Sequence, residues 1–170
     1  FAGQHLFEID SDGLKVYPRM DPRVVEGYTA PAGRVTSAIA GLTEMMGGGI
    51  ESSTSAVIVG SSGAGKSIAA LSFLIPGATE GKPGLFVSFE ERPDQLVRNA
   101  EQLGWNLADL VDRNLLDILY VSPSELDIDK HAAVIKHHAE AIKAETVVID
   151  TISAIEASLQ GEPKAHDYLW

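Results

Sequence analysis

The chain has 170 residues, a formal net charge of −11 and no cysteine. Its hydrophobic fraction of 45% indicates a globular domain with a core rather than a disordered chain. No apolar run approaches the ~20 residues that span a bilayer, and the absence of cysteine excludes disulfides and thiolate metal sites. The acidic balance disfavours unaided binding to nucleic acid and is ordinary for a cytoplasmic protein. We therefore expect a cytoplasmic protein, and the short apolar runs predict no membrane segment.

The first residues predict a β-hairpin. His5–Ile9 and Leu14–Tyr17 alternate in polarity, and Asp12-Gly13 between them supplies turn chemistry. The region from about Pro18 to Ala32 is rich in proline and shows no periodicity, which predicts a linker.

The rest of the chain alternates between apolar strands and helices, which is typical of a parallel sheet covered on both faces. Strands are predicted at Ser55–Val59, Leu85–Phe89, Ile118–Val121 and Val147–Ile149. Helices are predicted at Gly41–Met46, Lys66–Ile75, Pro93–Leu103 and about Asp129–Ala144, with Pro76-Gly77 ending the second. The fold class is therefore α/β.

A phosphate-binding loop follows the first of these strands. Residues 60–67 match G-x-x-x-x-G-K-[ST] at every fixed position and precede a predicted buried helix. Glycines let the backbone wrap around phosphates, and the N–H groups at the helix start attract anions. Lys66 is expected to reach the β- and γ-phosphates of ATP, and the Ser67 hydroxyl to ligate Mg²⁺. The predicted ATP-binding set is Ser61, Ser62, Gly63, Ala64, Gly65, Lys66, Ser67 and Ile68. The alternative is a flexible turn.

Two further strands end in carboxylates. Val147–Ile149 leads to Asp150, which resembles a Walker B aspartate that holds Mg²⁺. Glu90 and Glu91 follow Leu85–Phe89 and could orient an attacking water. Because parallel strands present their carboxyl ends at one sheet edge, we expect these residues near the phosphates. A structural alternative is that the glutamates favour the start of the next helix.

The order of these motifs resembles the KaiC family of RecA-superfamily ATPases. Residues 36–49 are similar to that family's opening S-T-G-I-P-G-L-D-E-L-L-G-G-G, departing at Ala38, Ala40 and Thr43. The phosphate loop, residues 88–91, residues 103–105 and residues 148–150 follow in family order. The resemblance implies a RecA-like core, a catalytic role for Glu90, Glu91 and Lys66, and a homo-oligomeric, usually hexameric, ring. It also implies regulatory protein partners and, in some members, autokinase activity.

The resemblance also predicts the domain organisation. Residues 1–19 are similar to the tail of a preceding KaiC-type domain, 20–34 form a linker, and 35–170 form an ATPase domain truncated after Walker B. We therefore expect an internal fragment that lacks the family's next strand and its trans-acting Lys/Arg finger. Walker B must then pair directly with the phosphate-loop strand, or another segment or chain fills the gap.

Together the motifs and the resemblance predict ATP binding and hydrolysis, with ADP as product, coupled to oligomer or partner switching. Two alternatives stay open. One is a nucleotide-gated interaction module with negligible turnover, which the truncation favours. The other is a DNA-dependent recombinase-like ATPase, which the net charge of −11 disfavours.

Overall fold

A three-stranded parallel sheet forms the centre of the protein. The computed structural model describes residues 6–17, 32–122 and 128–153. Its sheet has the order β6-β5-β7, built from β6 (Leu116–Tyr120), β5 (Gly84–Ser88) and β7 (Thr146–Asp150). In register, Ser88 at the end of β5 lies opposite Tyr120 on one side and Asp150 on the other. All three strands therefore end at one edge, as predicted for the carboxylates that follow them.

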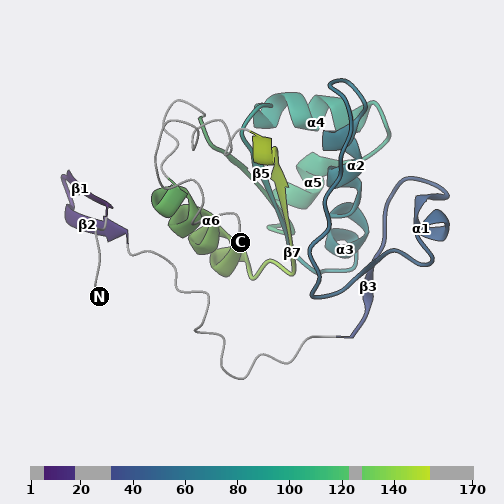
Figure 1. The fold of residues 1–170 in the computed structure, drawn as a ribbon, viewed down its shortest axis with the longest axis horizontal. Helices are drawn as coiled ribbons and strands as arrows, with labels where there is room; N and C mark the ends of the chain where they lie inside the picture. Colours follow the sequence, from purple (N-terminus) through teal and green to yellow (C-terminus); the bar gives the residue numbers. More distant parts are fainter. Residues whose placement is uncertain (1–5, 18–31, 123–127, 154–170) are drawn as a thin grey trace.

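Helices cover both faces of this sheet (Figure 1). On one face lie α2 (Lys66–Ser72), α3 (Ile75–Thr79), α4 (Pro93–Glu101) and α5 (Leu107–Asp112), around a core that includes Phe86, Leu71 and Leu96. On the other face, α6 (Ile128–Ile142) packs its Ile135, Ala139 and Ile142 against Leu85 and Val87. Every residue of β5 is buried, because the strand has a neighbour on each edge and helices on each face. The α/β, RecA-like fold class is confirmed.

A small β-α-β unit precedes the phosphate loop. It consists of β3 (Arg34–Val35), α1 (Leu42–Met45) and β4 (Ile50–Glu51), with the two strands antiparallel. Gly49 has φ +101°, and a Cβ there would lie 2.3 Å from the Val35 carbonyl oxygen, so the turn into β4 requires glycine. The Ser37 and Ser72 hydroxyls are 2.7 Å apart, which ties the unit to the end of α2.

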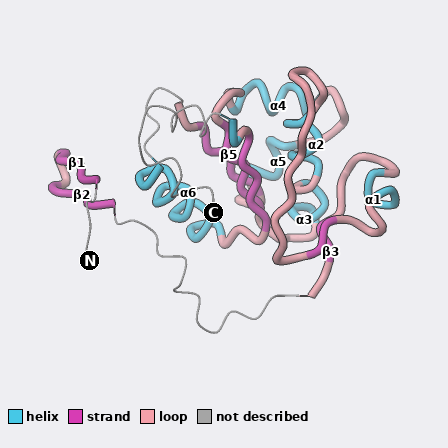
Figure 2. The backbone as a smooth tube through the Cα atoms, in the orientation of Figure 1, coloured by secondary structure: helices cyan, strands magenta, loops and turns pink. Residues whose placement is uncertain are grey.

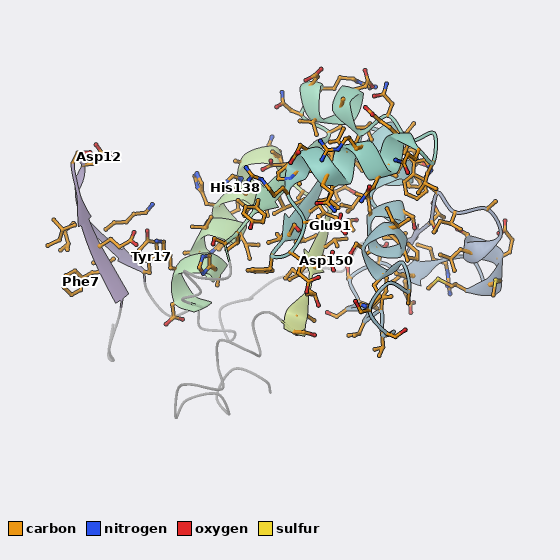
Figure 3. The ribbon with its side chains drawn as sticks, turned by 90° about the horizontal axis from the view of Figure 1, so that it is seen from above. Phe7, Asp12, Tyr17, Glu91, His138 and Asp150 are labelled. Atoms are coloured by element: carbon orange, nitrogen blue, oxygen red, sulfur yellow. The ribbon has the colours of Figure 1, made fainter. Side chains whose placement is uncertain are left out.

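The predicted N-terminal hairpin is present as β1 (Leu6–Asp10) and β2 (Gly13–Tyr17). Its polar face lies on α6: Lys130 Nζ donates to Glu8 Oε1 at 2.5 Å, and Tyr17 Oη donates to Glu8 Oε2 at 2.8 Å. In Figure 3, Tyr17 is on the side toward α6 and Phe7 is on the opposite side. The outward face is apolar and exposed, and it consists of Phe7, Ile9, Leu14 and Val16.

Two local predictions were wrong. Ser55–Val59 is not a strand; Figure 2 draws the segment leading into α2 as loop, and Val57 and Val59 are 72% and 89% exposed. Its apolar pattern fits a buried strand, but no described strand pairs with it, and β7 pairs with β5 instead. The helix predicted at Lys66–Ile75 ends at Ser72, and Pro76 and Gly77 lie inside α3. Proline is tolerated there because the first turn of a helix needs no N–H donor.

The remaining predicted helices and strands are confirmed with shifts of a few residues, and the structure adds β3, β4, α3 and α5. The linker predicted at about Pro18 to Ala32 lies almost entirely outside the described residues. Among the described residues, no helix is both long and apolar enough to cross a membrane.

Candidate functional site

The phosphate-loop motif forms an exposed glycine-rich turn at the start of α2. Gly63 and Gly65 have φ values of +77° and +84°, in the left-handed region that side chains disfavour. Gly65 is the N-cap residue of α2, and no side chain caps the helix there. The first N–H groups of α2 are therefore open to an anion, as the motif predicts.

Lys66 folds back over this loop. Its Nζ donates to the carbonyl oxygen of Ser61 at 2.9 Å. A carbonyl oxygen is a weaker partner for an ammonium group than a phosphate oxygen. The lysine is thus already at the mouth of the loop, held by a bond that a phosphate could replace.

Asp150 lies across a groove from the loop. A cavity of about 620 Å³ is lined by Gly60 and Lys66 on one side and by residues 145–153, including Asp150, on the other. Asp150 is 7% exposed, and its Oδ2 is buried without a hydrogen-bond partner. Because a buried carboxylate oxygen without a partner costs stability, this atom fits a cationic ligand.

The donor set suits magnesium completed by a nucleotide. The described residues contain no group of three or more His, Cys, Asp or Glu that could hold a metal alone. Mg²⁺ in proteins commonly takes one or two protein oxygens and fills its shell with phosphate oxygens and water. Ser67, in the first turn of α2, and Asp150 match that pattern.

Glu90 and Glu91 differ in their surroundings. Glu90 is exposed, and it has no hydrogen-bond partner among the residues that the structure describes. Glu91 is half-buried, its N–H donates to Ser88 Oγ at 3.0 Å, and its Oε2 accepts from Asn99 Nδ2 at 3.2 Å. Ser88 lies opposite Asp150 in the sheet, so Glu91 and Asp150 belong to the same edge (Figure 3).

The long walls of the groove are apolar. One is the loop segment Ala56–Val59, and the other is β7, whose Val147 and Ile149 are 43% and 41% exposed. No described strand lies along β7 on this side. The groove therefore separates the phosphate loop from the sheet that carries Asp150.

The structure thus brings Lys66 and Asp150 onto one cavity. Both glutamates, residues 61–65, Ser67 and Ile68 lie outside its lining. The sequence analysis did not find Ser88 or Asn99 as supports for Glu91. Ser88 precedes Glu91 by three residues, a spacing at which a serine hydroxyl commonly accepts a backbone N–H. Asn99 gave no such signal, because its contact depends on how α4 packs.

Comparison with known proteins agrees with these features. The family model described as "ATPase: KaiC" matches residues 35–169. The "Circadian clock protein KaiC2" of Synechocystis sp. is 37% identical over 131 residues, covering 72% of this chain and 23% of that protein. The "Circadian clock oscillator protein KaiC" of Thermostichus vulcanus is 31% identical over 147 residues, covering 81% of this chain and 28% of that protein.

A shorter relative is also similar. A "UPF0273 protein" of Methanopyrus kandleri is 30% identical over 137 residues, covering 72% of this chain and 54% of that protein. The chain spans about a quarter of the length of the two clock proteins. The family match covers the phosphate loop, the glutamate pair and Asp150. The chain belongs to the KaiC family of RecA-superfamily ATPases.

Proposed function

We propose that this domain binds ATP with Mg²⁺ at the phosphate loop and hydrolyses it to ADP and phosphate. The observation that carries the proposal is the shared cavity of Lys66 and Asp150, together with a buried Asp150 oxygen that has no hydrogen-bond partner. Family membership supports the same reaction class.

Each residue has a defined task in this proposal. Backbone N–H groups of residues 61–68 bind the phosphates, and Lys66 exchanges Ser61 for the β- and γ-phosphates. The Ser67 hydroxyl and Asp150 hold the magnesium, which neutralises charge on the phosphates. The glutamate pair accepts the proton of the attacking water.

Calorimetry of the purified chain with ATP and Mg²⁺ tests the binding step. Lys66→Ala removes the side chain that reaches the phosphates and should weaken affinity by about tenfold or more, since a charge-assisted hydrogen bond contributes about 1.5–3 kcal/mol. Lys82→Ala is the matched control, because Lys82 pairs with Glu80 on the surface and does not line the groove. Equal affinity in the wild-type chain and Lys66→Ala would contradict the assigned site.

A nucleotide-gated interaction module is the second candidate, and the exposed segment Ala56–Val59 favours it. The segment predicted as the strand that supports the phosphate loop is outside the described sheet, so the loop reaches the sheet only through the packing of α2. Binding without turnover is expected from such a site. Phosphate release measured beside bound nucleotide separates the two: release at a steady rate supports the ATPase, and bound ATP that persists supports the module.

We further propose that nucleotide state is coupled to assembly into a homo-oligomer or to protein partners. The resemblance to clock proteins supports this coupling. Sedimentation of the chain with ATP, with ADP and without nucleotide tests it, and identical profiles in all three would contradict it.

A further inference from the structure

The two adjacent glutamates are held in different ways. Glu91 is anchored at its backbone by Ser88 and at its carboxylate by Asn99, whereas Glu90 is exposed and has no such bond among the described residues. A catalytic carboxylate must keep its orientation within a fraction of an ångström of the reacting water. The structure therefore distinguishes two positions that the sequence motif treats alike.

Asn99 occupies a rigid position from which to hold Glu91. It lies in α4, next in sequence to Ala100 and one helical turn after Leu96, and both of these are fully buried. Glu91 lies just before α4, beyond the fully buried Ser88 at the end of β5. Asn99 is thus held by the packing of α4, and the Glu91 backbone is held by its hydrogen bond to Ser88.

The chemistry of this pair suits a base. An asparagine amide fixes one carboxylate oxygen and has no formal charge, whereas a lysine or arginine partner would make a carboxylate less basic. The bond uses Glu91 Oε2 and leaves Oε1 without a partner among the described residues. One oxygen is held and the other is available to accept a proton.

We propose that Asn99 is a positioning residue that orients Glu91 as the water-activating carboxylate, with Glu90 in a lesser role. This inference rests on the proposed hydrolysis of ATP. Asn99 acts through Glu91 and touches neither nucleotide nor water in this assignment.

Steady-state ATPase kinetics of the chain with single and double variants test the proposal. Asn99→Leu removes the donor at similar size and should lower kcat about ten- to a hundredfold, with KM for MgATP within about twofold. Glu91→Gln should lower kcat by about a hundredfold or more, and Glu90→Gln by much less. In a Glu91→Gln background, Asn99→Leu should cause no further loss, because its effect passes through Glu91.

Two further variants separate positioning from folding. Asn99→Ala removes the donor and substitutes a strong helix former without adding charge beside Glu91, so it should reproduce the loss even if Asn99→Leu is destabilised. Gln95→Leu removes an exposed amide from the same helix and should leave kcat unchanged. Thermal unfolding confirms that each variant is folded.

The contact itself can be observed without turnover. The Asn99 side-chain amide signals in an NMR spectrum should shift in Glu91→Ala and stay in place in Glu90→Ala. The positioning role alone is overturned if the wild-type chain hydrolyses ATP and Asn99→Leu keeps the wild-type kcat. It is also overturned if the kcat losses of Asn99→Leu and Glu91→Gln add in the variant that carries both changes. Magnesium-dependent ATP binding with no phosphate release from the wild-type chain would overturn the proposed hydrolysis and the positioning role together.

Discussion

At the scale of single residues, the site combines side chains that have hydrogen-bond partners with one whose buried oxygen has none. Lys66 has a carbonyl partner and Glu91 has an amide partner, but Asp150 keeps a buried oxygen with none. Such an atom destabilises the protein without ligand and gains most when a cation arrives. Stability and ligand binding are therefore opposed at this position.

The variant Asp150→Asn tests that opposition. Removing the buried charge should raise the free energy of unfolding of the nucleotide-free chain by roughly 1 kcal/mol. The same change should remove most of the dependence of ATP affinity on Mg²⁺. Urea unfolding and calorimetry with and without Mg²⁺ measure the two effects, with Asp112→Asn on α5 as the control. A loss of stability in Asp150→Asn would show that this carboxylate is satisfied in the native protein.

At the scale of elements, the Glu8 carboxylate links the hairpin to Lys130 of α6. Hydrogen bonds from Lys130 and then from Tyr17 lower the pKa of Glu8 below its usual value of 4.5. A lowered pKa in the docked state means that docking favours the ionised form. Its contribution is complete above about pH 4.5 and is lost as the pH falls through the lowered pKa.

Acidification should therefore release the hairpin. We expect the NMR signals of the Tyr17 ring to move toward those of an exposed tyrosine below about pH 4.5. The Glu8→Gln variant should show weaker docking at neutral pH and lose this transition. A transition of the same size in Glu8→Gln would assign it to other carboxylates.

The elements also show how far the sequence could predict this fold. Strands β5, β6 and β7 were predicted within a few residues, because buried parallel strands are continuous apolar runs between turn signals. Ser55–Val59 has the same pattern and is still loop, because a strand also needs a neighbour to pair with. Pairing is decided by the whole chain and cannot be seen in a local window.

Shorter elements and single contacts also divide into those that a local sequence window predicts and those that depend on pairing or packing with the rest of the chain. β3 and β4 have two residues each, too few to show alternation, and they exist because they pair with each other. The start of α5 did carry a signal, since Asn106 accepts the N–H of Asp109 as an N-cap. At the site, the phosphate loop and Asp150 could be predicted from fixed spacing. The bond between Asn99 and Glu91 depends on helix packing and could not.

At the scale of the whole molecule, the edge of β7 that no described strand covers is the feature with the widest consequence. Exposed strand edges carry unpaired N–H and C=O groups that tend to pair with other chains. Val147 and Ile149 add apolar side chains beside that edge. The chain without nucleotide should therefore self-associate as its concentration rises.

Lysine substitutions at this edge should reduce the association. Val147→Lys with Ile149→Lys places like charges along β7, where they repel an approaching strand. The variant should remain monomeric in sedimentation at concentrations where the wild-type chain forms larger species. Val111→Lys adds charge at an exposed position on α5 and should leave association unchanged. Equal association of the wild-type chain and the double-lysine variant would locate the contact elsewhere.

The full burial of β5 has a last consequence for how local stability is distributed. Opening β5 disrupts pairing on both its edges and the packing of both cores, so it requires a free energy close to that of global unfolding. The segment Ala56–Val59 has no sheet partner among the described residues and can open at little cost. The buried strand β5 leads to Glu91, and the exposed segment Ala56–Val59 leads to Lys66. A ligand that contacts both Lys66 and the carboxyl end of the sheet would therefore tie an easily opened segment to a strand that opens only with the core, and ligand binding would make their opening cooperative.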